Sequence, residues 1–314
     1  MVRIAKMPYS LVFEPPRILG QVLADDEYDM LTEPPRNFRS GEIILHVSCQ
    51  TMSVAHIPYL AQAIMRRLGL DFSTVGGPEN CCGSFHWHMG DEEYERQTAT
   101  MTLGAFRRMK PARVVSTCPD CDASFARHTA RQHTYVRSNV AELLGENVEK
   151  LKKLMVNPVR KKVAIHYHDD VPERQRDAHG IRALMEAVPG LEVLDAPNAR
   201  GLTGHCVKMF GSVQPDVTDR MFQEARALGA DHLVVPYHGC YRQHCKQQLV
   251  YGVEVSHYLS IIAMAIGIPC AETFKAIRML DNIDDAMKRL MPRIEKLGFD
   301  PQEVRQFVET SVYV

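Results

Sequence analysis

Five cysteines in the first half of the chain are the side chains whose types and spacing could do chemistry. They occur at three places, separated by 31 and 35 residues: Cys49, the pair Cys81 and Cys82, and Cys118 with Cys121. Separations this long mean that folding, and not a local loop, must bring the sulfurs together. Clustered cysteines that stay reduced inside a cell are more typical of metal or redox chemistry than of disulfides. The sequence therefore predicts a metal or redox site built from thiols.

The residues next to these cysteines suit such a site. Cys118 is followed by Pro119, a good first helical residue, so Cys121 is expected in the first turn of a helix, where a thiolate is favoured. Gly83 would let the backbone approach a cluster without a Cβ in the way. A single Cys-x-x-Cys could instead be a thioredoxin-like dithiol or half of a zinc site. Zinc sites and cubane clusters commonly use four cysteines, so either one of the five is spare or the cluster is unusual.

Each of the three places follows a predicted strand. The strands are expected at residues 42–48, 72–75 and 113–116, with helices at 59–68 and 91–109 between them. This alternation is typical of βαβ units around a parallel sheet, and the carboxyl ends of such strands meet at one edge.

The same order of elements recurs about 120 residues later in the chain. Strands are expected at 161–167, 191–194 and 232–236, followed by His168-Asp169, His205-Cys206 and His238-Gly239-Cys240. We therefore predict an α/β fold of two duplicated βαβ-type modules with parallel sheets. The predicted domains are an N-terminal extended arm (1–40), a first module (41–155), a second, degenerate module (156–270) and C-terminal helices (271–314).

The second half keeps fewer cysteines and gains histidines, and its chemistry stays open between three interpretations. Cys206, His238, Cys240 and Cys245 could hold a second metal, either zinc or iron. The same region could line a substrate pocket in which His205 or His238 donates protons. It could also be a degenerate repeat whose polar groups are only hydrogen-bonded.

Composition limits the classes of partner. The 314 residues carry a net charge of −1 and a pI near 6.9, which gives no electrostatic reason to expect nucleic acid or an anionic membrane. The longest apolar run, Leu259 to Ile268, is far below the ~20 residues of a membrane span. The first 20 residues have no continuous signal-peptide core. We expect a cytoplasmic protein without a membrane span.

The pattern Cys49, Cys81-Cys82-Gly83, Cys118-Pro119-x-Cys121 resembles the cysteine-rich CCG domain found in the disulfide-reducing subunit of heterodisulfide reductase. Similar domains occur in iron–sulfur subunits of glycolate and lactate oxidation complexes and of some succinate:quinone reductases. The resemblance covers roughly residues 40–270. In heterodisulfide reductase, five such cysteines hold a noncubane 4Fe–4S cluster at which a disulfide is reduced. The resemblance thus implies an oxidoreductase acting on sulfur groups, with the same five cysteines as cluster ligands.

Partners follow from the motifs that the sequence lacks. It contains neither a ferredoxin-type cysteine run nor a Gly-x-Gly-x-x-Gly fingerprint for a flavin or nicotinamide. Electrons should therefore pass through a ferredoxin-like iron–sulfur subunit served by a flavoprotein subunit. The substrate would be a disulfide or sulfane sulfur on a small molecule or carrier protein. The alternatives are an electron-relay or scaffold subunit of a sulfur-oxidising or lactate/glycolate-type complex, without its own substrate, and a zinc-containing scaffold.

Overall fold

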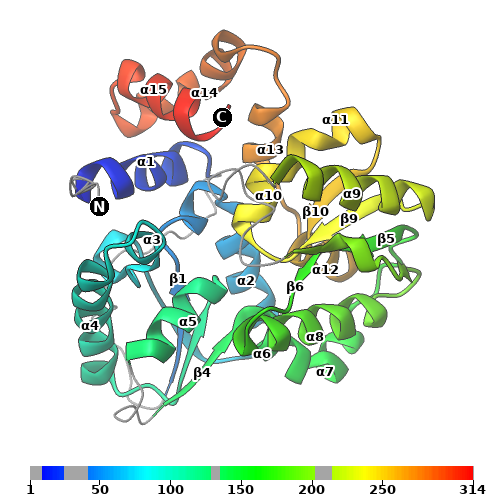
Figure 1. Ribbon diagram of the computed structural model, residues 1–314, viewed down its shortest axis with the longest axis horizontal. Coiled ribbons are helices and arrows are strands. Elements are labelled where there is room, and N and C mark those ends of the chain that lie inside the picture. The colour runs from blue at the N-terminus through cyan, green and yellow to red at the C-terminus, as the bar shows by residue number, and fades with distance from the viewer. Residues whose placement is uncertain (1–8, 25–41, 129–134, 202–213, 314) are drawn as a thin grey trace.

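The computed structural model describes residues 9–24, 42–128, 135–201 and 214–313 (Figure 1). Within these ranges the chain forms two four-stranded sheets with helices around them. Every strand pair in both sheets is parallel. The predicted α/β class with parallel sheets is therefore confirmed.

The first sheet has the strand order β2-β1-β3-β4. Its strands are β1 (Ile43–Val47), β2 (Phe72–Gly76), β3 (Arg113–Ser116) and β4 (Val136–Asn139). The helices that follow them are α2 (His56–Arg67), α4 (Glu92–Met109), α5 (Pro119–His128) and α6 (Val140–Glu146). Strands β1 and β3 contain short apolar runs, as expected where both faces of a parallel sheet are covered.

The second sheet repeats this arrangement with the order β10-β9-β5-β7. Its strands are β5 (Lys162–Ile165), β7 (Glu192–Leu194), β9 (His232–Val235) and β10 (Glu254–His257). The main helices are α8 (Pro172–Ala187), α9 (Gln214–Ala227), α10 (His238–His244) and α12 (Tyr258–Ile266). In both sheets the first strand lies between the second and the third, and the fourth lies outside the third.

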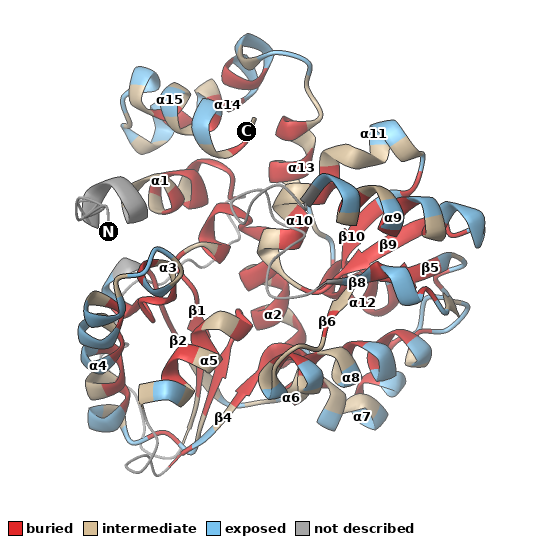
Figure 2. Ribbon diagram, in the orientation of Figure 1, coloured by how far each residue is buried: buried red, intermediate tan, exposed pale blue. Residues whose placement is uncertain are grey.

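The two halves share one hydrophobic core (Figure 2). Leu45 and Leu60 of the first half belong to the same buried cluster as Val163 and Leu233 of the second. Helices α6 and α8 approach closely across the boundary, since a Cβ on Gly180 would lie 2.5 Å from the carbonyl oxygen of Ala141. This shared core holds the carboxyl ends of the two sheets in a fixed relation.

The prediction of an extended arm over residues 1–40 was wrong for residues 9–22, which form helix α1 (Tyr9–Val22). Two prolines inside the helix, Pro15 and Pro16, argued against it. The helix forms because Ile18, Leu19 and Val22 are buried in the common core, and tertiary packing outweighs local propensity. The remainder of the predicted arm, apart from Leu23 and Ala24, lies outside the described residues.

The tail is helical, as predicted, with α13 (Thr273–Arg278), α14 (Ile283–Leu297) and α15 (Pro301–Ser311). Helix α1 lies beside α14 and α15 (Figure 1). The shorter elements are η1 (Thr51–Ser53), η2 (Pro78–Asn80), α3 (Ser84–His88), α7 (Val148–Leu154), β6 (Tyr167–His168), η3 (Pro197–Ala199), β8 (Arg200–Gly201), η5 (Cys245–Gln247) and α11 (Gln248–Tyr251).

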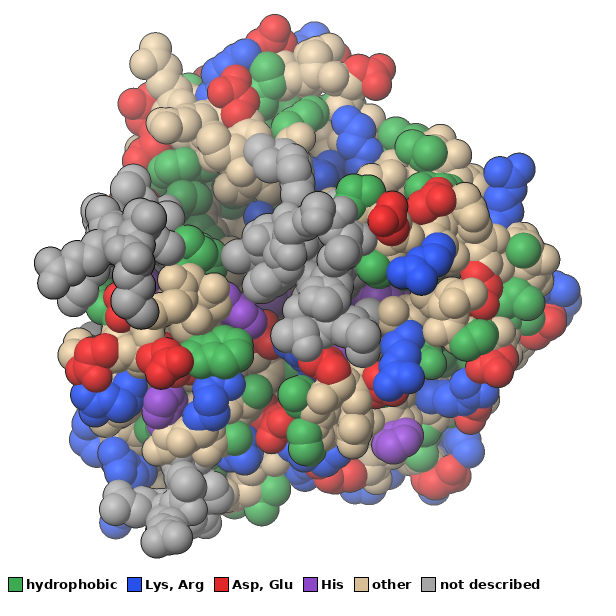
Figure 3. All heavy atoms as spheres, in the orientation of Figure 1, with side chains coloured by type: hydrophobic (Ala, Val, Ile, Leu, Met, Phe, Trp, Pro, Cys, Tyr) green, Lys and Arg blue, Asp and Glu red, His purple; other side chains and the backbone are tan. Residues whose placement is uncertain are grey.

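The surface carries charges of both signs. Acidic and basic side chains are interspersed over the coloured part of the face drawn in Figure 3, as the net charge of −1 suggests. Among the described helices, none has both the length and the apolar character needed to cross a bilayer.

Candidate metal centre

The structure brings the five first-half cysteines to one cavity of about 160 Å³ between the two halves. Each is buried, with at most 7% of its surface exposed. All five are free thiols. The predicted convergence of the five cysteines is therefore present. Their role as metal ligands stays a prediction.

Strand order explains why the sulfurs meet. Strand β1 lies between β2 and β3, so the segments that leave these three strands emerge side by side at one edge of the sheet. Cys49 follows β1, the pair Cys81 and Cys82 follows β2 and η2, and Cys118 follows β3. Helix α5 begins at Pro119, which places Cys121 in its first turn as predicted.

The sulfur positions suit a metal. The Sγ atoms of Cys49 and Cys81 lie 3.7 Å apart. Two thiolates on one tetrahedral ion with metal–sulfur bonds of ~2.3 Å are separated by about 3.8 Å. Cys82 contacts both Cys81 and Cys121, and Cys121 contacts Cys118, so the five thiols form a continuous chain of contacts. No three of these five sulfurs, all of which the structure describes, lie within 4.8 Å of one another, so the set fits a group of several metal atoms better than a single ion held by three or more of the thiolates.

Crowding and burial raise the pKa of three of these thiols, Cys81, Cys82 and Cys121. The contact with Cys49, together with burial, raises the pKa of Cys81 well above its ordinary value. The contacts of Cys121 with Cys118 and with Cys82, and then burial, raise its pKa in the same direction. For Cys82, the contact with Cys121 lowers the pKa, but the neighbouring Cys81 and burial outweigh it. A bound cation would reverse this balance, because thiolates are the metal-binding form and metal binding releases protons.

A requirement for glycine at position 83 is visible in the backbone itself, and the predicted role of Gly83 in letting the backbone approach a cluster stays a prediction. Its φ is +77°, a left-handed conformation that favours glycine. A Cβ there would lie 2.8 Å from both the Cα and the carbonyl oxygen of Glu95 in α4. The absence of a side chain thus allows the loop to pack against helix α4. The Gly83 N–H donates to Cys81 Sγ at 3.3 Å, and the Ser84 N–H lies 3.5 Å from Cys82 Sγ.

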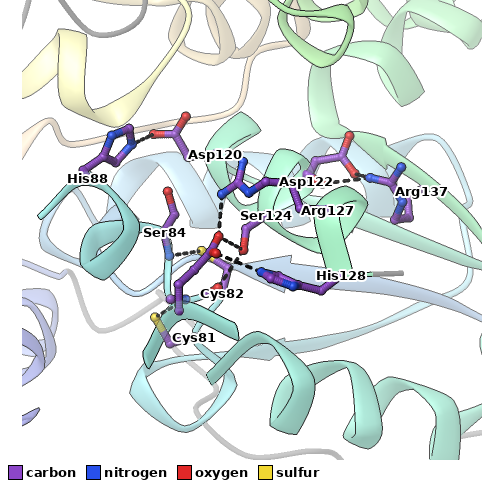
Figure 4. Close-up of polar contacts among 12 residues, drawn as sticks. Cys81, Cys82, Ser84, His88, Asp120, Asp122, Ser124, Arg127, His128 and Arg137 are labelled. Atoms are coloured by element: carbon purple, nitrogen blue, oxygen red, sulfur yellow. Dashed lines mark hydrogen bonds and ion pairs between the residues drawn. The ribbon is translucent and has the colours of Figure 1, made fainter. Parts of the chain in front are cut away.

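A buried polar network behind the cysteine pair was not foreseen from the sequence (Figure 4). Thr102 Oγ1 donates a hydrogen bond to the carbonyl oxygen of Cys81 at 2.6 Å. The Ser124 hydroxyl lies 2.8 Å from the carbonyl oxygen of Cys82. Ser124 also lies 2.8 Å from the carboxylate of Glu95, which is 2% exposed. The sequence alone does not distinguish Glu95 from Glu92 and Glu93, which are exposed in the same helix.

The Glu95 carboxylate is held ionised by its partners. It accepts a hydrogen bond from Arg127 at 2.5 Å and contacts His128 at 2.8 Å. Burial raises the pKa of Glu95, but the hydrogen bonds from Arg127, His128 and Ser124 outweigh it and lower the pKa below its ordinary value. The network therefore fixes the backbone that carries both cysteines of the pair.

The second half supplies the opposite wall of the cavity, including His168, Arg174, Tyr237, His238 and Cys240. Arg174 donates to Asp120 Oδ1 at 2.5 Å and so ties α8 to the helix that bears Cys121. Burial of Asp120 alone would raise its pKa, but His88 and Arg174 hold it well below its usual range. Residues of both halves thus line the cavity.

Of the predicted proton donors, His238 lines the cavity, and His205 lies outside the described residues, as does Cys206. Burial, and then Arg242, lowers the pKa of His238 to about 4, so its imidazole is neutral near pH 7. Its Nδ1 lies 3.1 Å from Thr51 Oγ1, which in turn lies 2.5 Å from Ser48 Oγ.

The other second-half candidates are divided between two places. Cys240 lines the cavity, whereas Cys245 is buried, with its thiol 3.9 Å from the carbonyl oxygen of Arg242. In the part of the chain that the structure describes, the side chains grouped closely enough to hold a metal in this half are His166, His168 and Cys240. From the sequence, His168 was noted only as following a strand, and His166 was placed inside that strand.

Comparison with known proteins supports the cysteine site. Residues 43–126 match the family model described as CCG, cysteine-rich domain. This match includes all five cysteines of the cavity. Together with their convergence, it indicates a metal or iron–sulfur site in the first half. No curated protein matches the chain.

Solved structures show only distant similarity. An aspartate racemase homologue from Pyrococcus horikoshii OT3 has 14% identity and a TM-score of 0.33, covering 72% of this chain and 98% of that one. A hypothetical protein from Helicobacter pylori has 11% identity and a TM-score of 0.47, covering 88% and 58%. Glutamate racemase isoform RacE1 from Bacillus anthracis has 15% identity and a TM-score of 0.30, covering 73% and 81%. These scores carry no argument about function.

Proposed function

We propose that this chain is a redox subunit that carries a noncubane 4Fe–4S cluster and reduces or oxidises a disulfide or sulfane sulfur, in the manner of heterodisulfide reductase. The observation that supports this most is the convergence of five thiols, within the CCG match, on one cavity. Cys49, Cys81, Cys82, Cys118 and Cys121 would hold the cluster. Such a cluster, when bound, supplies single electrons to a sulfur–sulfur bond.

Reduction of a disulfide to thiols also takes up protons, and hydroxyl and imidazole groups of the cavity wall can relay protons within the cavity. Ser48 lines the cavity, and its hydroxyl is linked through Thr51 to the Nδ1 atom of His238. A hydrogen-bonded chain of two hydroxyls and a neutral imidazole can pass a proton without holding a buried charge. Phe85 and Pro119 complete the wall and limit access of water to the thiols.

Electrons would reach this buried site through a partner, a ferredoxin-like iron–sulfur subunit itself served by a flavoprotein subunit. The substrate sulfur could be carried by a small molecule or by a carrier protein. The protein would then act as an oxidoreductase on sulfur groups within a cytoplasmic complex.

Metal content tests the proposal first. Anaerobic reconstitution of the full chain with iron and sulfide should give about four of each per chain. Cys81→Ser should lose most of both, because Cys81 contacts two of the other thiols. Cys270→Ser is the matched control, since this cysteine is outside the cavity, and it should keep the wild-type content. Zinc in place of iron, or full iron in Cys81→Ser, would contradict the proposal.

Turnover tests the reaction. With a chemical reductant in place of the partner, reconstituted protein should reduce an organic disulfide, and Cys81→Ser should not. Iron bound in the expected amount without any disulfide turnover would favour an electron-relay subunit without its own substrate.

A further inference from the structure

We propose that His166, His168 and Cys240 bind one divalent transition-metal ion, assigned as zinc, with its remaining coordination position toward the cavity. This site belongs to the second half and shares no residue with the five-cysteine site. It does not depend on the function proposed above.

Two adjacent parallel strands bring the three side chains together. His166 directly follows β5, and His168 lies two residues further along, in β6. In an extended segment, residues two apart lie on the same side. Their ring centroids are 4.9 Å apart. Cys240 is the third residue of α10, which follows β9, the neighbour of β5 in the sheet.

The distances match a metal site. One donor atom from each side chain lies within 4.8 Å of the other two. The Nε2 atom of His168 and the Sγ atom of Cys240 are 3.4 Å apart. A tetrahedral zinc with bonds of ~2.05 Å to nitrogen and ~2.3 Å to sulfur would separate them by about 3.6 Å. All three side chains are buried, so water does not compete for their donor atoms.

His166 is already oriented as a ligand. Its Nδ1 hydrogen-bonds to the carbonyl oxygen of Ala199. A carbonyl only accepts, so Nδ1 carries the proton and Nε2 presents a lone pair. This Nε2 atom is buried and has no hydrogen-bond partner among the described residues. A thiol–imidazole hydrogen bond between Cys240 and His168 explains their contact without a metal, but it leaves the lone pair of His166 unsatisfied.

The equivalent histidine of the first half shows what a purely structural role looks like. His46 pairs with the last residue of β3, and His166 is at the corresponding position beside β9. His46 Nε2 also bonds a carbonyl oxygen, that of Asn80, at 2.7 Å. The Nδ1 atom of His46 is also buried without a hydrogen-bond partner among the described residues. The difference is that the His46 ring packs against Phe106 and Phe125, with centroids 5.6 and 5.2 Å away, so aromatic carbon and no second donor faces it. Beside the His166 ring, the imidazole of His168 and the thiol of Cys240 stand where the two phenylalanine rings stand beside His46.

The donor set excludes magnesium and calcium, which prefer oxygen ligands. Two imidazoles and one thiolate suit zinc or copper. Three protein ligands with one further position are typical of zinc sites that bind a small ligand. His168 and Cys240 also line the cavity of the five cysteines. The fourth ligand is therefore a water or a thiolate that enters from this cavity.

Zinc content of matched variants tests the site. The full chain, expressed in zinc-supplemented medium and purified anaerobically, should contain about one zinc ion per chain. His166→Ala and Cys240→Ser should each lower zinc binding at least tenfold. Cys245→Ser is the control, because it removes a buried thiol from the next element without touching the three donors. Iron in the same samples should be unchanged, which separates failure of this site from failure of the first.

A measurement on the unaltered protein avoids the risk that a variant does not fold. Anomalous X-ray scattering at the zinc edge should place a peak between His166, His168 and Cys240. X-ray absorption spectra at the zinc edge should show two imidazole nitrogens and one sulfur bound to the metal. Zinc found only at the first-half cysteines, or equal zinc content in Cys240→Ser and Cys245→Ser, would overturn the proposal. An iron-edge peak at these three residues would overturn the assignment of zinc.

Discussion

Substitution of Gly83 by alanine should destabilise the protein through two separable effects. Its φ of +77° costs a residue with a Cβ about 1–2 kcal/mol. The new Cβ would also lie 2.8 Å from the Cα and the carbonyl oxygen of Glu95. Both are backbone atoms of α4, so the clash is relieved only by moving the helix, at a cost of about 1–3 kcal/mol. The total expected loss in free energy of unfolding is about 2–5 kcal/mol.

Gly90→Ala provides the matched control. Its φ is +81°, but a Cβ there would meet no atom within 4 Å. It should therefore lose only the backbone contribution of about 1–2 kcal/mol. Urea unfolding of both variants, followed by circular dichroism, gives the difference directly. If Gly83→Ala is no less stable than Gly90→Ala, the close packing of this loop on α4 is not what requires glycine.

Three further substitutions have defined outcomes. Thr102→Val should cost about 1–3 kcal/mol in urea unfolding, because the buried carbonyl of Cys81 loses its 2.6 Å donor, whereas Thr102→Ser should restore most of the loss. Gly180→Ala should destabilise the fold, because the new Cβ would lie 2.5 Å from the carbonyl oxygen of Ala141. Gly104→Ala in α4 has room for a Cβ and should stabilise the fold by up to about 1 kcal/mol. A higher unfolding midpoint for Gly180→Ala than for Gly104→Ala would contradict this. Burial lowers the pKa of His46 from 6.5 to about 4. The neutral imidazole therefore contributes fully to the free energy of unfolding above pH 6.5. This contribution, about 3 kcal/mol in all, is lost as the pH falls from 6.5 toward 4, because the unfolded chain takes up the proton first. His46→Gln should flatten the fall in unfolding free energy between pH 6.5 and 4, and an unchanged slope would refute the assignment.

Much of the fold was predictable because its signals are local. Strands β1 and β3 are short apolar runs bounded by polar residues or proline, and covering both faces of a parallel sheet requires such runs. The start of α5 at Pro119 follows from proline's fixed φ at a first helical position. The convergence of the cysteines then follows from their places after neighbouring strands.

What the sequence did not predict depends on contacts between distant segments. Helix α1 contains two prolines, and only burial of residues such as Leu19 explains its formation. Glu95 gives no local sign that it faces Ser124 and Arg127. His166 was placed in a strand by its apolar neighbours, and its lone pair becomes visible only when the carbonyl of Ala199 and the thiol of Cys240 are in position.

The two halves place different donors at equivalent points of the same strand order. Cys121 is the third residue of α5, five residues after the end of β3, and Cys240 is the third residue of α10, five residues after the end of β9. Around Cys121 the neighbours are thiols, whereas beside Cys240 lies the imidazole of His168. Thiols alone favour soft metals and clusters, and mixed imidazole–thiolate sets favour single ions. Because Cys121 and Cys240 line one cavity, the two proposed metal sites would face each other across it, with different donors on each side.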